Sequence, residues 1–330
     1  ITKKVSARLE EIFKSDRTEY ESKWDDIKIF IEYGMLTEQK FCESAMKFVL
    51  LSNTDGKHFT LDEYKTLIES EQTDKDGNLI YLYATDAIAQ YNYINSAKEK
   101  GYDVLLMDGQ LDSHFIGLLE SKLEKSQFVR VDSDVIGNLI KKDTKKEVNL
   151  SQLQREILTT EFRSQIPDIE KCEFVVSFEA MGETDAPLII TQGEYMRRMK
   201  EMAAMQPGMS FYGELPDSYS LIVNTDHPLV AKVLNDADAN IASEVSPILE
   251  SISSKNNQIS ELKKDNKAAD EIKQLESEVS ELRSKQENLI SEYASKQAVV
   301  KQLIDLALLG NGLLKGEALS SFIKRSVELL

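Results

Sequence analysis

Apolar residues at helical spacing dominate the first 75 positions. Val5, Leu9, Ile12 and Phe13 fall at i, i+4, i+7 and i+8, which places them on one stripe of a helix. Comparable stripes predict three further helices, over about 24–33, 41–49 and 61–67. Thr60 precedes the last of these and has the side chain of a helix N-cap. Residues 1–75 are therefore expected to be helical.

Short apolar runs alternate with helical patterns between residues 76 and 134. Three strand-like runs and the two helices between them are predicted at 79–84, 86–100, 104–107, 112–122 and 128–131. Gly101 lies where a helix C-cap glycine is expected. Strands connected by helices in this way pair in parallel through right-handed crossovers. The pattern predicts a small parallel αβα sandwich.

A polar, lysine-rich segment follows the sandwich. Residues 135–149 contain few apolar positions and are predicted to be a linker, so the first domain is expected to span 1–134. Residues 150–330 are predicted to form an α+β domain with a short sheet. Its helices and strands are expected at about 150–162, 172–178, 188–190 and 219–223, with a methionine-rich helix before the last strand.

From about Ala242 a heptad pattern begins. Eleven positions from Ile272 to Ala307 alternate spacings of three and four, and nine of them are apolar, which predicts one long helix with an apolar seam. A weaker seam runs from Ile248 to Leu262, and a bend is expected at Asp265-Asn266. The simplest arrangement is an antiparallel helical coiled-coil hairpin that projects from the domain. One longer continuous helix is the alternative.

Five of the nine methionines fall between residues 196 and 209. A helix turns about 100° per residue, so methionines three apart fan over about half of its circumference. The resulting methionine arc contains Tyr195, Met196, Met199, Met202, Ala203 and Met205. Arg197, Lys200 and Glu201 lie opposite, and Arg198 alone intrudes. The arc is either a buried core face or an adaptable surface for partners of variable shape, because methionine is unbranched and polarizable.

The last segment is strongly apolar for a chain end. Two apolar helices joined by Gly310-Asn311-Gly312 cannot both bury their apolar faces alone. Pairing with the same helices of a second copy makes a four-helix bundle around a two-fold axis, and folding back on their own domain is the alternative. The predicted dimer-interface residues are Leu303, Leu306, Leu309, Leu313, Leu314, Phe322, Ile323 and Val327.

The amino-acid composition argues against two classes of partner, nucleic acids and membranes. Forty Lys and Arg against 57 Asp and Glu give a net charge of −17, which argues against a nucleic-acid partner. No apolar run approaches the roughly 20 residues of a membrane span, so no membrane partner is predicted. Two cysteines, Cys42 and Cys172, suit a reducing compartment and a cytoplasmic protein. The start at Ile1, without a signal peptide, leads us to expect a piece of a longer protein.

Candidate chemistry is sparse. His58, His114 and His227 lack the spacing of a zinc site, and no phosphate-loop, dinucleotide-binding or nucleophile-elbow motif is found. We predict no catalytic residue, no metal site and no cofactor site. A coiled-coil scaffold that holds partners together is one hypothesis for the function, and an enzyme with its site in the sandwich is another. The latter has a suitable topology but no convergent polar groups.

Several ordered strings resemble the ninety-kilodalton heat-shock chaperones, most closely the bacterial members. They are Phe59-Thr60-Leu61-Asp62-Glu63-Tyr64, Ile80-Tyr81, Gly101-Tyr102-Asp103-Val104-Leu105-Leu106, Leu111-Asp112, Thr184-Asp185-Ala186-Pro187, Arg198-Met199-Lys200, Asn224-Thr225-Asp226-His227-Pro228-Leu229-Val230 and Phe322-Ile323-Lys324-Arg325. Their common order and spacing is more specific than any one string. The resemblance covers the chain except the coiled-coil region, where about 238–290 look like an inserted helical hairpin.

The resemblance implies that the chain is the C-terminal half of an ATP-driven homodimeric chaperone. Residues 1–134 would be the distal part of the middle domain and 150–330 the C-terminal dimerisation domain. The family's ATP and Mg²⁺ site would lie before Ile1, so this chain itself is expected to bind no nucleotide and not to be an enzyme. Partners would be a second copy and unfolded or partly folded client proteins.

The resemblance also assigns roles to single residues. Client contacts map onto Tyr195, Met199, Met202 and Ala203, all within the methionine arc. The family's second client-contacting aromatic falls at His114, beside Phe115. Bacterial relatives carry tryptophan at the position of His114, so this residue departs from the family pattern, and a surface histidine without a client contact is the alternative. His227 would cap a helix. Leu330 ends the chain without the acidic pentapeptide that binds tetratricopeptide co-chaperones, so these partners are not expected.

Overall fold

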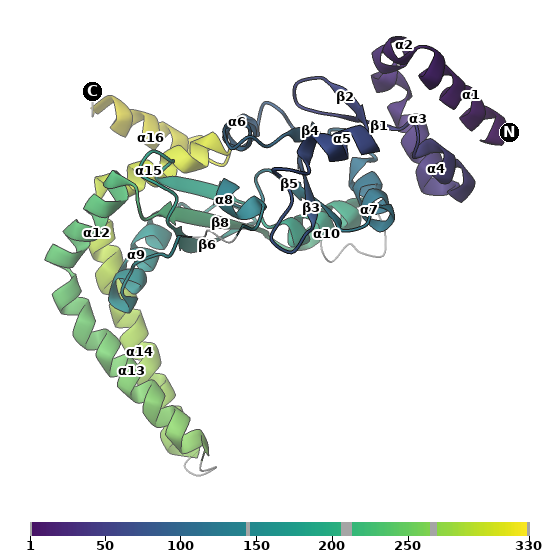
Figure 1. The fold of residues 1–330 in the computed structure, drawn as a ribbon. Helices are drawn as coiled ribbons and strands as arrows, with labels where there is room; N and C mark the ends of the chain where they lie inside the picture. Colours follow the sequence, from purple (N-terminus) through teal and green to yellow (C-terminus); the bar gives the residue numbers. More distant parts are fainter. Residues whose placement is uncertain (1, 143–145, 206–212, 265–268, 329–330) are drawn as a thin grey trace. The chain divides into compact units, whose positions relative to one another are not determined.

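Contacts divide the chain into two units. The computed structural model describes residues 2–142, 146–205, 213–264 and 269–328 (Figure 1). Contacts group Ile1–Lys145 with Thr191–Asp217 as one unit, and Lys146–Ile190 with Ser218–Leu330 as the other. The sequence placed the methionine-rich helix in the second domain, whereas the contacts group it with the first unit. The bend expected at Asp265-Asn266 lies outside the described residues.

The first unit begins with helices, as the stripes predict. They are α1 (Thr2–Ser15), α2 (Arg17–Ser22), α3 (Trp24–Thr37), α4 (Gln39–Ala45) and α5 (Leu61–Ile68). Trp24 and Ile31 are buried in a core shared with the sandwich. Thr60 and Glu63 form a capping box at the start of α5. A short antiparallel pair, β1 (Leu50–Ser52) and β2 (His58–Thr60), lies between α4 and α5 and was missed by the sequence analysis.

The predicted parallel sheet is confirmed. β3 (Leu79–Ala84) lies between β4 (Val104–Leu106) and β5 (Ser126–Arg130) and pairs in parallel with both. Tyr81 and Tyr83 point into the core that contains residues of α5 and α7 (Asp112–Lys122), and the alternate β3 residues point into a core with α6 (Tyr91–Glu99) and α8 (Ile136–Leu139). Helices on both faces explain why β3 is apolar at every position.

Helix α6 begins five residues later than predicted. The Gln90 side-chain oxygen accepts hydrogen bonds from the backbone N–H groups of Thr85 and Asp86, and Asp86 Oδ1 accepts from those of Ile88 and Ala89. These side chains satisfy the backbone in a turn, so the helix starts only at Tyr91.

Part of the predicted linker belongs to the first unit. Val135, Leu139 and Ile140 are buried in the core on the α6 side of the sheet. Their spacing puts three apolar side chains on one side of the short helix α8, a signal that the surrounding lysines conceal. The structure therefore differs from a linker that starts at residue 135, because the chain passes from one unit to the other at Lys145–Lys146.

The second unit is built around a three-stranded sheet. Strands β6 (Cys172–Glu179), β8 (Asp217–Asn224) and β7 (Leu188–Thr191) lie in the order β6-β8-β7. Helices α9 (Gln152–Gln165), α12 (Pro228–Asn240), α15 (Ala298–Gly310) and α16 (Gly316–Glu328) contribute to the same core. His227 is the N-cap of α12 and its Nδ1 accepts from the Leu229 N–H at 3.1 Å. The predicted α+β class is confirmed by this arrangement together with the parallel sheet.

The coiled-coil hairpin is present. Helices α13 (Ala242–Lys264) and α14 (Ala269–Ala294) run side by side (Figure 1). Ile248, Ile252, Ile259 and Val279 form their shared core, and Lys255 pairs with Glu278 across the two helices. This arrangement decides against one longer continuous helix through the whole region.

The single long helix predicted over Ile272 to Ala307 is wrong at one point. The chain leaves the helix after Ala294 and resumes it in α15 at Ala298, with turn hydrogen bonds from Lys296 and Gln297. Val300 and Leu303 then pack in the core of the domain, whereas Ile272 packs in the hairpin. The heptad spacing persists although the apolar residues have two different partners. Among the described residues, no helix has the length and apolarity needed to cross a membrane.

Candidate functional site: the methionine helix and the terminal helix pair

The helix α10 (Glu194–Met205) docks through its charged residues. Glu194 Oε1 accepts hydrogen bonds from the Tyr83 hydroxyl at 2.9 Å, from Arg197 at 2.6 Å and from Arg198 at 2.6 Å. Arg197 Nη2 also donates to Tyr83 Oη at 2.7 Å. Because Tyr83 lies on the central strand β3, this cluster fastens α10 to the sheet of the first unit.

A second set of contacts connects α10 to α7 and β5. Arg198 pairs with Glu120 at 2.9 Å and donates to the backbone carbonyl of Phe128. Glu120 in turn accepts from the Phe128 N–H at 2.8 Å. Ser113 on α7 donates to Glu201 at 3.1 Å. Ion pairs and hydrogen bonds thus hold α10, both from Glu201 opposite the methionine arc and from Arg198, the one charged residue within it.

Electrostatics keep this cluster ionised. Burial raises the pKa of Glu194, but the positive charges of Arg197 and Arg198 outweigh burial and leave the pKa below its ordinary value. Burial lowers the pKa of Arg197, and the carboxylate of Glu194 more than reverses that effect. A buried charge is tolerated only with such partners, so the cluster fixes which face of α10 turns inward.

Along the described part of the methionine arc, exposure falls from Tyr195 to Ala203. Tyr195 is 71% exposed and Met196 is exposed, Met199 and Met202 are half-buried, and Ala203 is buried. The side chain of Met205 lies outside the described residues, as does Met209. The arc is therefore not a simple core face, because its first turn presents an aromatic and an aliphatic side chain to solvent.

Two residues on α7 carry predicted client contacts, and the structure separates them. His114 is half-buried, whereas Phe115 is buried in the core of the first unit with Leu119. Phe115 is thus positioned as a packing residue, and a client contact there requires the core to open. His114 lies next to Ser113, one of the residues of α7 that contact α10.

The predicted dimer residues also fall into two groups. Leu303, Leu314 and Phe322 are buried in the core of their own unit, and Leu313 is half-buried against it. Four residues remain exposed: Leu306 at 50%, Leu309 at 41%, Ile323 at 53% and Val327 at 66%. Of the eight predicted dimer residues, these four are the ones that offer an exposed apolar surface to another molecule.

An ion-pair cluster fixes the two terminal helices to each other. Asp305 on α15 is fully buried, and it pairs with Lys301 at 2.6 Å and with Arg325 on α16. Gln302 donates to the hydroxyl of Ser326 at 2.9 Å. These contacts set the relative orientation of α15 and α16, and with it the arrangement of the exposed leucines and isoleucine.

The polar partners of these two surfaces were not predicted from the sequence. Glu194, Tyr83 and Glu120 gave no motif, since they meet only in the folded chain. One signal was present: Arg198 interrupts the methionine arc, and a charge inside an apolar arc indicates a buried partner. A buried polar group on α3, formed by Lys28 and Glu32, was also missed, although both residues fall on the side of the apolar stripe.

Comparison with known proteins agrees with the family resemblance. The sequence model of the family described as Hsp90 protein matches residues 1–302, so the chain belongs to the Hsp90 family. It is 53% identical over 340 residues to the chaperone protein HtpG of Bacteroides thetaiotaomicron and 51% identical over 347 residues to that of Porphyromonas gingivalis. Both alignments cover 100% of this chain, so they include the hairpin.

A more distant relative is the chaperone protein HtpG of Bdellovibrio bacteriovorus, 25% identical over 245 residues, which cover 71% of this chain and 37% of that protein. The chain spans about half the length of the Bacteroides and Porphyromonas relatives, 50% in each case.

Proposed function

We propose that this chain is the client-binding and dimerising part of an Hsp90-type chaperone. The observation that carries the proposal is the orientation of α10: its charged side is buried in ion pairs, and its methionine side begins in the open with Tyr195 and Met196. An adaptable apolar surface held outward by a buried ionic cluster suits polypeptides that differ in sequence. Family membership supports the same role.

The test is suppression of client aggregation. Met199→Glu with Met202→Glu places two charges on the half-buried part of the arc and is expected to weaken suppression strongly. The matched control is Ile88→Glu with Tyr91→Glu, which charges two exposed apolar residues of the same unit outside the arc. Equal suppression by the arc variant and the wild-type chain contradicts the proposal.

We also propose that α15 and α16 mediate a homodimer. Leu306 and Ile323 are apolar, half exposed and held in place by the Asp305–Arg325 pair, which supports a preformed interface. A second copy presents the same surface, so a two-fold arrangement covers both. Loss of dimerisation in Leu306→Glu with Ile323→Glu is the expected result.

The scaffold hypothesis is less well supported. The apolar seam of α13 and that of α14 pack against each other inside the hairpin. In the described part of the chain, neither helix carries an exposed large apolar side chain. A partner helix would find no apolar stripe there.

ATP and Mg²⁺ are proposed to bind in the part of the parent protein outside this chain, and the protein is proposed to act in the cytoplasm. Calorimetric titration of the 330-residue chain with Mg-ATP is expected to give no saturable heat. Tight binding would contradict this assignment.

A further inference from the structure

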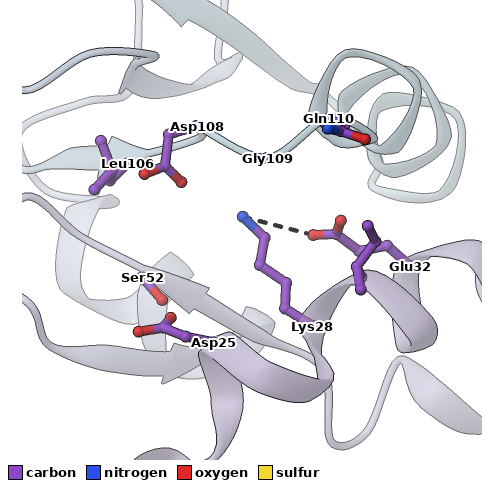
Figure 2. Close-up of a pocket in the computed structure, with 9 residues that line it drawn as sticks. Asp25, Lys28, Glu32, Ser52, Leu106, Asp108, Gly109 and Gln110 are labelled. Carbon is purple, nitrogen blue, oxygen red and sulfur yellow. Dashed lines mark ion pairs between the residues drawn. The ribbon is translucent and has the colours of Figure 1, made fainter.

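A small cavity in the first unit is lined by α3 and by the loop that follows β4. Its volume is about 300 Å³. The lining residues are Asp25, Lys28, Ile29, Glu32, Ser52, Leu106, Asp108, Gly109 and Gln110. Figure 2 shows the Lys28 ammonium and the Asp108 carboxylate reaching into the space between these segments, with the Glu32 carboxylate turned toward Lys28.

Glu32 is the unusual group of this cavity. Its side chain is 2% exposed, and its Oε1 has no hydrogen-bond partner and lies 3.8 Å from Lys28 Nζ. Lys28 itself is held by Asp112 Oδ2 at 2.9 Å, and the same oxygen accepts from the Gly109 N–H at 2.8 Å. The ammonium of Lys28 therefore donates to Asp112, and Oε1 of Glu32 on the cavity wall accepts no hydrogen bond.

The cavity carries an excess of negative charge. The carboxylates of Asp25 and Asp108 line it together with one ammonium, which already faces Asp112, and Glu32 adds a further carboxyl group. Among the described residues, no group of three or more His, Cys, Asp or Glu side chains is arranged to hold a metal ion. An organic cation that donates hydrogen bonds therefore suits Glu32 Oε1 better than a metal ion does.

An apolar rim adjoins this charge. At about 100° per residue, Ile29 and Tyr33 lie within about 80° of Asp25 on the surface of α3. Ile29 and Tyr33 are both exposed, Tyr33 at 62%. The volume is at the small end of ligand sites, which suits one side chain rather than a whole cofactor.

We propose that this cavity binds the guanidinium group of an arginine, presented by a polypeptide segment that lays a neighbouring apolar side chain on Ile29 and Tyr33. Guanidinium offers five donors in a planar fork, so one group can address Glu32 and a second carboxylate of the cavity lining at once. The proposal concerns a surface separate from the methionine arc and does not depend on the proposed chaperone function.

The protonation of Glu32 gives the site a distinctive signature. Burial, and then the negative charge of Asp112, raise the pKa of Glu32 to about 8, against the opposing effect of Lys28. The charged groups that face Glu32 are Lys28 on its own helix and Asp112 on α7, with Asp25 and Asp108 on the cavity wall. The empty site therefore holds a proton at neutral pH, and an arriving guanidinium displaces it. Affinity should rise with pH up to about 8.

Calorimetry with the full 330-residue chain tests the proposal. The probe is acetyl-Phe-Arg-amide, with acetyl-Phe-citrulline-amide as its uncharged match. We expect saturable binding of the arginine peptide and binding about tenfold or more weaker for citrulline, because only the former makes charge-assisted hydrogen bonds. At pH 7 the heats in phosphate and in Tris buffer should differ, since binding releases a proton.

Matched variants locate the binding. Glu32→Gln should weaken arginine-peptide binding about tenfold and abolish the buffer dependence. Asp25→Asn should weaken it, whereas Asp26→Asn, which removes the same charge one residue away and outside the cavity lining, should leave it within about twofold. If Glu32→Gln does not fold, Asp25→Asn with Asp108→Asn takes its place.

Three results would overturn the proposal: no saturable binding, equal binding of the citrulline peptide, or equal weakening by Asp25→Asn and Asp26→Asn. In each case Glu32 keeps its proton in a carboxyl–carboxylate interaction with Asp112, as in the empty site.

Discussion

Arg197 Nη2 donates a hydrogen bond to Tyr83 Oη at 2.7 Å, and this contact joins the methionine helix to the central strand of the first unit. Both side chains are buried, and both also contact Glu194. A guanidinium in such a position cannot turn to solvent without removing one hydrogen bond from the Glu194 carboxylate and one from the Tyr83 hydroxyl. The inward face of α10 is thus decided by charge, which leaves Tyr195 and Met196 outside.

Removing this guanidinium should loosen α10. Arg197→Ala leaves Glu194 partly buried with one counter-charge fewer, and the docking of the helix should weaken by about 2 kcal/mol or more. Amide hydrogen exchange over residues 194–203 should accelerate, while exchange in β3 stays slow. Lys200→Gln is the control, because its pair with Asp217 is more exposed and should contribute little. Unchanged protection of α10 in Arg197→Ala would show that other contacts hold it.

Buried and exposed residues of the terminal helix pair and its connecting segment should respond differently to substitution. Leu314→Ala empties a buried position and should lower the free energy of unfolding by about 2–5 kcal/mol. Val327→Ala removes an exposed side chain and should leave that free energy of the isolated subunit almost unchanged. Urea unfolding at low protein concentration distinguishes the two. Similar losses for both variants would mean that Val327 is covered within its own subunit.

The tip of the hairpin should be dispensable for the rest of the second unit. The outer residues Ile259, Ile272, Leu275 and Val279 pack only within the hairpin, whereas Val245 and Ile290 at its base pack with Ile157 of α9. Replacing residues 254–283 with a short Gly-Ser turn should therefore preserve the oligomeric state and the thermal unfolding midpoint within a few degrees. A deletion variant that no longer folds, or no longer associates, would assign the tip a structural role.

Glu161 predicts a pH dependence of stability. It is fully buried on α9 and neither carboxyl oxygen has a hydrogen-bond partner, and burial followed by the charge of Asp236 raises its pKa to about 8. The folded state then keeps a proton that the unfolded chain releases near pH 4.5. The stabilisation from this proton is complete below pH 4.5 and is lost at about 1.4 kcal/mol per pH unit as the pH rises toward 8.

Glu161→Gln should remove that slope and raise the unfolding midpoint at pH 7.5 relative to the wild-type chain. The control is Glu156→Gln on the same helix, which is half-buried and should not change the slope. Midpoints at pH 5.5, 6.5 and 7.5 measure the effect, and parallel curves for Glu161→Gln and wild type would show that the carboxyl is ionised in the folded state.

Periodicity predicted most of the elements, and local side-chain chemistry accounts for the differences. The run at Leu79–Ala84 is a strand with the predicted bounds because a strand buried on both faces is apolar throughout. The late start of α6 depends on Gln90 and Asp86 bonding the backbone, and no hydrophobic pattern encodes that. Between Ala294 and Ala298 the pattern fails in the opposite way. The heptad spacing continues through a break in the helix, although the apolar residues before the break pack in the hairpin and those after it pack in the core of the second unit.

The candidate surfaces were predictable only in outline. The methionine arc and the apolar chain end are visible from spacing, because one face of a helix recurs at a fixed period. Which of their residues stay exposed depends on partners distant in sequence. Phe322 is buried, whereas its neighbour Ile323 is exposed. Arg197 points into the first unit because its guanidinium donates hydrogen bonds to Tyr83 and Glu194.

The most direct test of the account is the solution mass of the 37.4 kDa chain by light scattering over a dilution series. The exposed apolar residues of α15 and α16 predict a particle of twice the chain mass at micromolar concentration, and Leu306→Glu with Ile323→Glu should halve it. A wild-type chain that scatters as a single copy throughout that range would contradict the account.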